Sequence, residues 1–226
     1  AAAIEIFNAD RKDLDKKITD QALIQIIDNK EEQNYSSVVY QEDWHKGVIG
    51  IVASRLIEKY YRPTLVFTKS GDKLAASARS VKGFDVYNAL HECEEFIEQF
   101  GGHKYAAGLT LLPENYEKFK KKFEKVVEKT IDKKLLTPEI SVDAEIELFE
   151  ITPKFFRIIQ QMAPFGPMNM KPTFKSTCVR DNGYGKQVGA DKTHLKLNVF
   201  QGDNKRTFNS IGFGLGDKMK LVKNDF

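Results

Sequence analysis

The spacing of apolar residues changes near Thr137-Pro138, and this change limits the possible folds more than any other feature of the chain. Before it, apolar residues fall at helical spacing between short apolar runs, as amphipathic helices and buried strands require. After it, alternate residues from Ile140 to Phe149 are apolar, which is typical of a strand with one buried face. Proline also ends a helix, because it lacks a donor N–H. The sequence therefore predicts a mixed α/β domain over residues 35–137 and a separate β domain over residues 138–226.

The first 34 residues differ in character from the α/β domain that follows them. Residues at three- and four-residue steps predict an amphipathic helix from Ile4 to Asp28; they are Ile4, Phe7, Arg11, Leu14, Ile18, Ala22 and Ile26. A polar stretch begins at Asn29. Because this segment has no apolar core of its own, we predict that residues 1–34 form a connecting helix and a linker.

The α/β domain is expected to alternate short strands with helices. In chain order, the expected elements are a strand over 36–40, a helix ending near residue 60, a hairpin of strands over 64–68 and 73–78, a helix whose apolar face runs from 86 to 100, and a lysine-rich helix between 113 and 136. Asp85 is the expected N-cap of the helix that begins at residue 86, because a carboxylate can accept the free N–H groups of a first helical turn.

The β domain is expected to contain four strands and one helix. The strands are predicted over 140–149, 173–179, 194–200 and 206–213, and the helix over 152–162, with Thr152 as its cap and Phe155, Ile158, Ile159 and Met162 facing inward. Short strands with variable loops suit a small barrel of the oligonucleotide-binding type.

The stretch Gly101-Gly102-His103-Lys104-Tyr105-Ala106-Ala107-Gly108 is the first candidate site. Glycines reach positive φ angles at little cost, and neighbouring free N–H groups can then form a concave anion site. His103 would add a side-chain donor. The stretch therefore predicts a phosphate-binding loop ahead of a strand from Leu109, with a plain glycine turn and a structural histidine as the alternative.

Two further positions are candidates for binding phosphate. His45 precedes a helix start marked by Gly47 and Gly50, where unpaired N–H groups and the helix dipole favour an anion. Arg79 ends a strand of small residues, and its planar guanidinium offers a fork to phosphate oxygens. Trp44 could stack on a base, but a tryptophan beside a helix start is more often a core anchor.

Several blocks together resemble the RecJ family, whose members are bacterial 5′-to-3′ exonucleases specific for single-stranded DNA. The blocks span residues 43–56, 77–80, 83–85, 101–108, 163–169 and 194–197. The resemblance implies a DHH-associated domain followed by an oligonucleotide-binding barrel. It also implies that Arg79, Ser80, Gly102 and His103 hold the scissile end of a strand against a metal centre. One departure is Met168-Asn169-Met170, where the family tends to have Gly-Asn-Pro.

The Asp-His-His triplet that names the DHH superfamily is absent from this sequence. The four histidines are scattered, so we expect no complete catalytic set, no metal bound by this chain and no activity from it alone. The resemblance implies that Mn²⁺ or Mg²⁺ is held by an upstream DHH domain. It also implies further strands beyond Phe226, so that the barrel would be truncated here.

Basic residues in the barrel are the candidate contacts to a nucleic-acid backbone. Residues 171–226 hold eleven Lys or Arg against five Asp or Glu, although the net charge of +3 for the whole chain argues little. The candidates are Lys175, Arg180, Lys186, Lys192, His194, Lys196 and Lys205.

The remaining expectations concern partners and cellular location. Cys93 and Cys178 lie far apart in the sequence, and no apolar run approaches membrane-spanning length, so we expect a cytoplasmic protein without disulfides. The resemblance implies a role in DNA repair and recombination, with single-stranded DNA, the upstream domain, a single-stranded-DNA-binding protein and a helicase as partners. Two alternatives are another DHH phosphoesterase acting on short oligonucleotides or cyclic dinucleotides, and a non-catalytic docking module.

Overall fold

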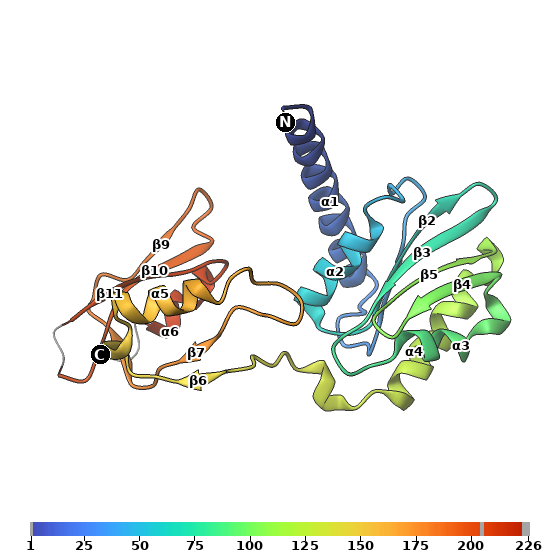
Figure 1. Ribbon diagram of the computed structural model, residues 1–226. Coiled ribbons are helices and arrows are strands. Elements are labelled where there is room, and N and C mark those ends of the chain that lie inside the picture. Colours follow the sequence, from blue (N-terminus) through green and yellow to red (C-terminus); the bar gives the residue numbers. More distant parts are fainter. Residues whose placement is uncertain (1, 204–205, 223–226) are drawn as a thin grey trace. The chain divides into compact units, whose positions relative to one another are not determined.

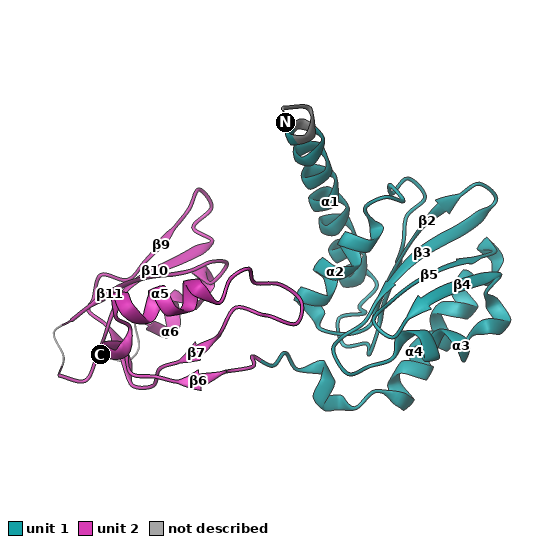
Figure 2. Ribbon diagram, viewed as in Figure 1, with its two compact units in different colours: residues 1–139 teal, residues 140–226 magenta. Residues whose placement is uncertain are grey.

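The computed structural model describes residues 2–203 and 206–222 (Figure 1). The chain forms two compact units, residues 1–139 and residues 140–226 (Figure 2). Among the described residues, no helix is both long and apolar enough to cross a lipid bilayer.

The first unit contains a five-stranded sheet in the order β1-β2-β3-β5-β4. Its strands are β1 (Ser37–Tyr40), β2 (Thr64–Ser70), β3 (Lys73–Arg79), β4 (Gln99–His103) and β5 (Ala106–Leu111). β1 and β2 run parallel, whereas the other neighbours are antiparallel. Gly71 takes a φ of +67° in the expected turn between β2 and β3, a conformation that suits glycine.

Two helices pack on one face of this sheet. They are α1 (Ala2–Asp28) and α2 (Ile49–Tyr60). Ile18, Ala22 and Ile26 of α1 are buried in a cluster with apolar residues of α2 and the sheet. Nε of Arg55 lies 2.7 Å from Oδ1 of the buried Asp15, which joins the two helices by an ion pair. Trp44 is only 4% exposed and belongs to this cluster, so its role as a core anchor is confirmed.

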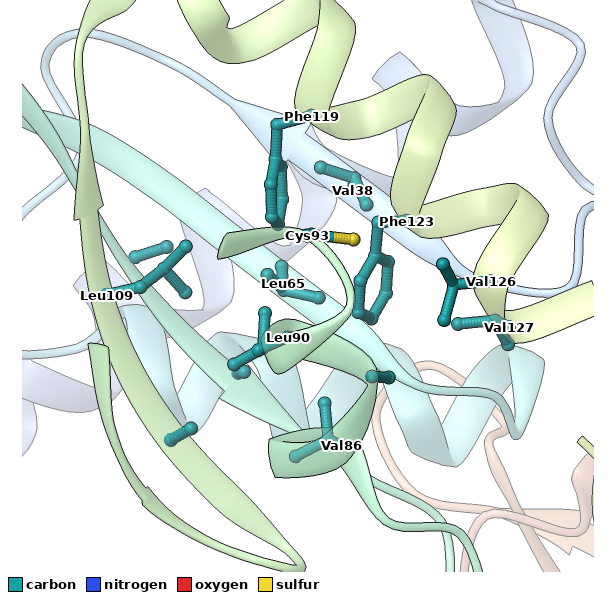
Figure 3. Packing of buried hydrophobic residues seen from close by; sticks show 14 of the residues in the cluster. Val38, Leu65, Val86, Leu90, Cys93, Leu109, Phe119, Phe123, Val126 and Val127 are labelled. Atoms are coloured by element: carbon teal, nitrogen blue, oxygen red, sulfur yellow. The ribbon is translucent and has the colours of Figure 1, made fainter. Parts of the chain in front are cut away.

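The opposite face packs against α3 (Val86–His91) and α4 (Tyr116–Thr130) (Figure 3). The rings of Phe119 and Phe123 stack with centroids 5.7 Å apart, and Phe67 meets Phe119 edge to face. Because so many aromatic and branched side chains are buried between the sheet, α3 and α4, this cluster is the main core of the unit.

Short 3-10 turns occur in both units, at Glu94–Phe96, Pro113–Asn115, Lys133–Leu136, Leu148–Glu150 and Gly216–Lys218.

The helix expected to reach Phe100 is much shorter. Asp85 caps it as expected, since its side chain accepts the N–H of Asn88, but α3 ends at His91. Residues 99–103 instead form β4, which pairs with β5. A helix through this stretch would lose that ladder. Tertiary pairing therefore overrides the helical spacing of the sequence.

A buried arginine fixes the segment between α1 and the sheet. Arg62 is 2% exposed, and burial lowers its pKa from the ordinary value. Its Nε donates to Oγ of Ser37 at 2.7 Å, and its terminal nitrogens donate to the carbonyls of Glu31, Glu32 and Asn34. Nε and both terminal nitrogens thus donate into one cage of oxygen acceptors, which a lysine cannot reproduce.

The second unit is built mainly on β10. Its strands are β6 (Ala144–Glu145), β7 (Phe174–Lys175), β8 (Val179–Asp181), β9 (Lys186–Val188), β10 (His194–Gln201) and β11 (Phe208–Gly212), and its helices are α5 (Pro153–Gln161) and α6 (Met219–Val222). β10 pairs antiparallel with β11 on one side and with both β8 and β9 on the other. β6 and β7 form a separate parallel pair.

Three expectations for this unit are wrong in detail. The strand predicted over 140–149 is reduced to two paired residues, and Ile140 is 80% exposed, because β7 offers only two residues for pairing. The strand predicted over 173–179 is divided into β7 and β8, with Cys178 at a φ of +53° between them. Thr152 caps α5 by accepting the N–H of Phe155, but Ile158 and Met162 are about half exposed rather than inward.

We predict that Arg62→Lys destabilises the first unit by about 2–4 kcal/mol, because lysine leaves several of these part-buried oxygen acceptors without a donor. Urea unfolding followed by fluorescence measures this effect, since Trp44 is the single tryptophan and lies in the first unit. Arg157→Lys, at an exposed position of α5, is the control and should leave the transition unchanged. Equal midpoints for the two variants would contradict the role given to Arg62.

Candidate nucleic-acid interface

In the described part of the first unit, no helix covers one half of one face of the sheet. α2 packs over β2 and β3, while on the same side β5 and β4 present Gly108 and Gly101, both exposed. Register places Ser77, Gly108 and Gly101 opposite one another on β3, β5 and β4. Directly opposed residues of a sheet share a face, so these three form a floor without large side chains.

The fold does not require glycine at two of these floor positions. A Cβ on Gly101 would meet no atom within 4 Å, and one on Gly108 would lie 3.8 Å from its nearest neighbour, the carbonyl oxygen of Ala76. Glycine inside a strand weakens the strand and often marks a close approach of another backbone or a ligand. The bare floor is therefore suited to a ligand that must come close to the protein backbone.

Gly102 serves a different purpose from its neighbour Gly101. It has a φ of +148°, and a Cβ there would lie 2.4 Å from the carbonyl oxygen of Ala106 and 2.5 Å from Cα of Ala107. Only glycine fits such a position. Gly102 thus allows β4 to fold onto β5.

The expected phosphate-binding loop over residues 101–108 is wrong as a loop. Both glycines lie in β4, and the chain turns at Lys104-Tyr105 into β5. The physical reason is an apolar alternation, since Ala107 and Leu109 point into the main core and hold this segment extended. The carbonyls of Lys104 and Tyr105 accept the N–H groups of Val86 and Ser80, which fixes the turn.

Arg79 lies beside the start of α2. Its Nη1 donates to Oγ of Ser77 at 3.0 Å and to the carbonyl of Ala78 at 2.8 Å. A Cβ on Gly50 would lie 2.8 Å from Nη2 of Arg79, so glycine at this position lets the guanidinium reach the helix backbone. Within the described residues, no acceptor lies within hydrogen-bonding distance of its Nε or Nη2.

The start of α2 also has free donors. Val48 is its N-cap and makes no side-chain cap, and the part of the chain that the structure describes offers no acceptor to the N–H groups of Ile49 and Gly50. A helix N-terminus carries partial positive charge, so a guanidinium beside it is unfavourable until an anion arrives. No carboxylate of the described residues lies within ion-pairing distance of Arg79. Arg79 and the helix start together therefore favour a bound anion.

His45 and His103 have similar local arrangements. Nδ1 of His45 accepts the N–H of Gly47 at 3.1 Å, and Nδ1 of His103 accepts the N–H of Tyr105 at 3.3 Å. Because Nδ1 is the acceptor in each ring, the hydrogen bonds assign the proton of the neutral ring to Nε2. Both side chains are exposed, so each presents an Nε2–H donor to solvent. Register places His103 and Arg79 on either side of Ala106, in one row across the sheet.

The structure gives Ser80 a mainly architectural position. Its Oγ donates to the carbonyl of Phe84 at 3.0 Å, and its N–H donates to the carbonyl of Tyr105. Sequence reasoning placed Gly108 in the candidate stretch but did not single out Ser77, which also belongs to the floor. The small-residue run Ala75-Ala76-Ser77-Ala78 could have indicated Ser77, had the strands been aligned.

In the second unit, four of the predicted basic contacts share one face of the sheet. Lys196 lies directly opposite Lys186, His194 opposite Val188, and Arg180 opposite Phe200. Since His194, Lys196 and Phe200 are separated by even steps along β10, their side chains point to the same side. Lys186, Lys196 and Arg180 are exposed there, which brings basic residues together on one surface.

The other three predicted contacts lie elsewhere. Lys175 is on β7 and pairs with Glu145 at 3.4 Å, and Lys192 lies in the turn between β9 and β10. Lys205 falls outside the described residues. His194 is partly committed to structure, because its Nδ1 accepts the N–H of Gly214 and its ring packs against Phe213. Among the described residues, no cluster of three His, Cys, Asp or Glu side chains could hold a metal ion.

Comparisons with known proteins agree with this layout. The DHHA1 domain model matches residues 13–129, and the RecJ OB domain model matches residues 142–225. The single-stranded-DNA-specific exonuclease RecJ of Bacillus subtilis is 31% identical over 221 residues, covering 96% of this chain and 27% of that protein. The protein of the same name from Salmonella typhimurium is 30% identical over 184 residues, covering 77% of this chain and 32% of that protein.

Solved structures share the fold. The crystal structure of RecJ in complex with Mn²⁺ from Thermus thermophilus matches with a TM-score of 0.74 at 22% identity, over 93% of this chain and 34% of that one. A crystal structure of exonuclease RecJ bound to manganese matches with a TM-score of 0.51 at 27% identity, over 58% of this chain and 32% of that one. This chain thus spans about a third or less of each of these four relatives.

We predict opposite consequences for alanine at the two neighbouring glycines. Gly102→Ala should cost at least about 2 kcal/mol of folding stability, since a Cβ collides with backbone at a positive φ. Gly101→Ala should change stability by less than about 0.5 kcal/mol, because the space above it is open. Thermal unfolding of both variants measures the difference.

Binding measurements on the same two variants distinguish a glycine that the fold requires from a glycine that a ligand requires. Folded Gly101→Ala should bind a phosphorylated probe more weakly than the unchanged chain does, because its methyl group keeps the probe away from the floor. Unchanged binding by this variant would contradict the floor as a contact surface.

Proposed function

The chain belongs to the RecJ family, and we propose that it is the part of a 5′-to-3′ single-stranded-DNA exonuclease that grips and positions the substrate. The observation that carries this proposal is the half-buried guanidinium of Arg79 beside the free N–H groups at the start of α2, above a floor of glycines. This arrangement suits a phosphate, which is anionic, matches a planar fork of donors and is small enough to approach bare backbone.

In this proposal, the first unit holds the scissile phosphate. Arg79 supplies paired donors, the start of α2 supplies backbone donors, and His103 and His45 supply Nε2–H groups at the margins. Holding the phosphate in line with an attacking water lowers the entropic part of the barrier. These residues bind and orient, and none of them takes the place of a general base.

Metal chemistry is assigned to a different domain. Mn²⁺ or Mg²⁺, held by a DHH domain that precedes this region in the intact protein, would activate the attacking water and stabilise charge on the phosphate. Two matched Thermus thermophilus structures are of RecJ in complex with Mn²⁺ and with Mg²⁺. The described residues of this chain contain no cluster fit to hold either ion.

The second unit is proposed to bind other nucleotides of the single strand. Its basic face formed by Arg180, Lys186 and Lys196 suits a run of phosphates. A dinucleotide would not need a second binding unit, so this face favours a strand of several nucleotides over cyclic or very short substrates.

The proposal extends to the cellular setting of the family. We place the intact protein in the cytoplasm, in DNA repair and recombination, where a helicase and a single-stranded-DNA-binding protein produce and cover its substrate.

Fluorescence anisotropy tests the proposal. We expect this chain to bind a labelled single strand more tightly than a duplex of equal length, with affinity falling as salt rises, because phosphate contacts release counterions. Arg79→Ala should weaken binding by about tenfold, and Arg79→Lys should restore only part of it, since lysine keeps the charge but not the fork.

A gel assay with Mn²⁺ present should show no hydrolysis of the strand by this chain.

In the anisotropy measurement, Lys118→Ala, on the exposed side of α4, is the matched control for loss of one positive charge and should bind the strand as the unchanged chain does. Absence of single-strand binding at low salt would overturn the proposal, as would equal losses for Arg79→Ala and the control.

A further inference from the structure

The basic face of the second unit contains a hollow of about 370 Å³. Its lining includes two lysines, three asparagines and one tyrosine: Lys186, Lys196, Asn182, Asn198, Asn209 and Tyr184. The asparagines and the tyrosine were not among the sequence-predicted contacts. A hollow of this size is comparable to small ligand sites.

The three asparagine side chains form a hydrogen-bonded row across neighbouring segments. Nδ2 of Asn182 donates to Oδ1 of Asn198 at 2.6 Å, and Nδ2 of Asn198 donates to Oδ1 of Asn209 at 3.1 Å. Asn198 and Asn209 are also directly opposite in the β10–β11 ladder. The row holds its amides in fixed orientations and leaves the Nδ2 of Asn209 without an acceptor within the described chain.

The turn that carries Tyr184 is fixed by a buried carboxylate. Asp181 is 7% exposed, and its two oxygens accept the N–H groups of Gly183, Gly185 and Asn198 at 2.8–3.0 Å. A Cβ on Gly185 would lie only 3.0 Å from that carboxylate. The backbone on both sides of Tyr184 is therefore tied to β10.

Tyr184 itself has no packing role that would explain this support. Its side chain is 78% exposed, and none of the aromatic or cation pairs of the described residues involves its ring. A large ring on a rigid turn, open to solvent, adds little to folding but offers a flat surface for stacking.

The two lysines provide an independent pointer to an anion. Lys186 and Lys196 occupy directly opposed positions on β9 and β10, where like charges destabilise a sheet. Neither lies within ion-pairing distance of a carboxylate among the described residues. A phosphate between them would relieve this repulsion.

We propose that this hollow binds one unpaired nucleotide of a DNA strand. The base stacks on Tyr184, its polar edge meets the amides of Asn198 and Asn209, and its phosphate lies between Lys186 and Lys196. An amide carries both donors and an acceptor, so the row offers hydrogen bonds to donor and to acceptor groups on a base edge. This inference rests on the proposed function, and it adds a reason for single-strand selectivity, because a duplex hides its base faces.

Binding of abasic strands tests the inference in the full chain. An oligothymidine with several abasic residues should bind about tenfold more weakly than intact oligothymidine of equal length. Tyr184→Leu should weaken binding of intact oligothymidine by a similar factor and remove the preference over the abasic strand. Tyr184→Phe should retain that preference, because the ring is kept.

Phe156→Leu is the matched control, since Phe156 is also an exposed aromatic residue of this unit, at 59% exposure, but lies on α5. It should bind both strands as the unchanged chain does. Photocrosslinking with 5-iododeoxyuridine supplies a second readout, with Tyr184 as the expected adduct.

The outcomes separate this inference from the proposed function. Tight, salt-sensitive binding that is equal for intact and abasic strands, or unaltered by Tyr184→Leu, would overturn the nucleotide subsite and leave the proposed function standing. No binding to any single strand would overturn both. A crosslink confined to the first unit would also contradict the subsite.

Discussion

The half-covered face of the first unit's sheet is the constraint on which the candidate interface depends. α3 and α4 pack the opposite face of the sheet, whereas α2 packs over β2 and β3. On the face that α2 only partly covers, β4 and β5 can therefore expose their backbone only if their side chains there are small. Gly102 makes this arrangement possible, because its positive φ and missing Cβ let β4 lie against β5. Gly101 is then left facing open space, and a Cβ on Gly108 would make only an ordinary van der Waals contact.

Positive charge that no nearby carboxylate of the described residues balances is a feature of the candidate sites in both units. Arg79 sits beside the positive end of α2, and Lys186 faces Lys196 across two strands. Each arrangement raises the energy of the free protein slightly and is relieved by an anion. Both sites are supported by neutral groups that fix geometry: Ser77 for the arginine, and the asparagine row beside the lysines. This combination of charge and fixed donors suits a phosphodiester strand.

Much of the fold could be predicted from the sequence, because local patterns and tertiary contacts agree there. The hairpin at Gly71, the cap at Asp85 and the burial of Trp44 follow from residue chemistry alone. The prediction failed where strand pairing overrides the helical spacing of apolar residues, because residues 99–103 form β4 against β5 instead of a helix end and a loop. The site could not be assembled without the strand register, because Ser77 is far from Gly101 and Gly108 in the chain and meets them only across the sheet. Tyr184 and its asparagines were missed for the same reason.

The most direct test of the account is a titration of the ¹⁵N-labelled chain with a short phosphorylated single strand, followed by the glycine amide signals. The account predicts shifts for Gly50, Gly101 and Gly108, which lie at the start of α2 and on the bare floor. It predicts no shift for Gly71, in the β2–β3 turn. Shifts that spare the floor glycines, or that persist unchanged in Arg79→Ala, would contradict the claim that this surface holds the phosphate.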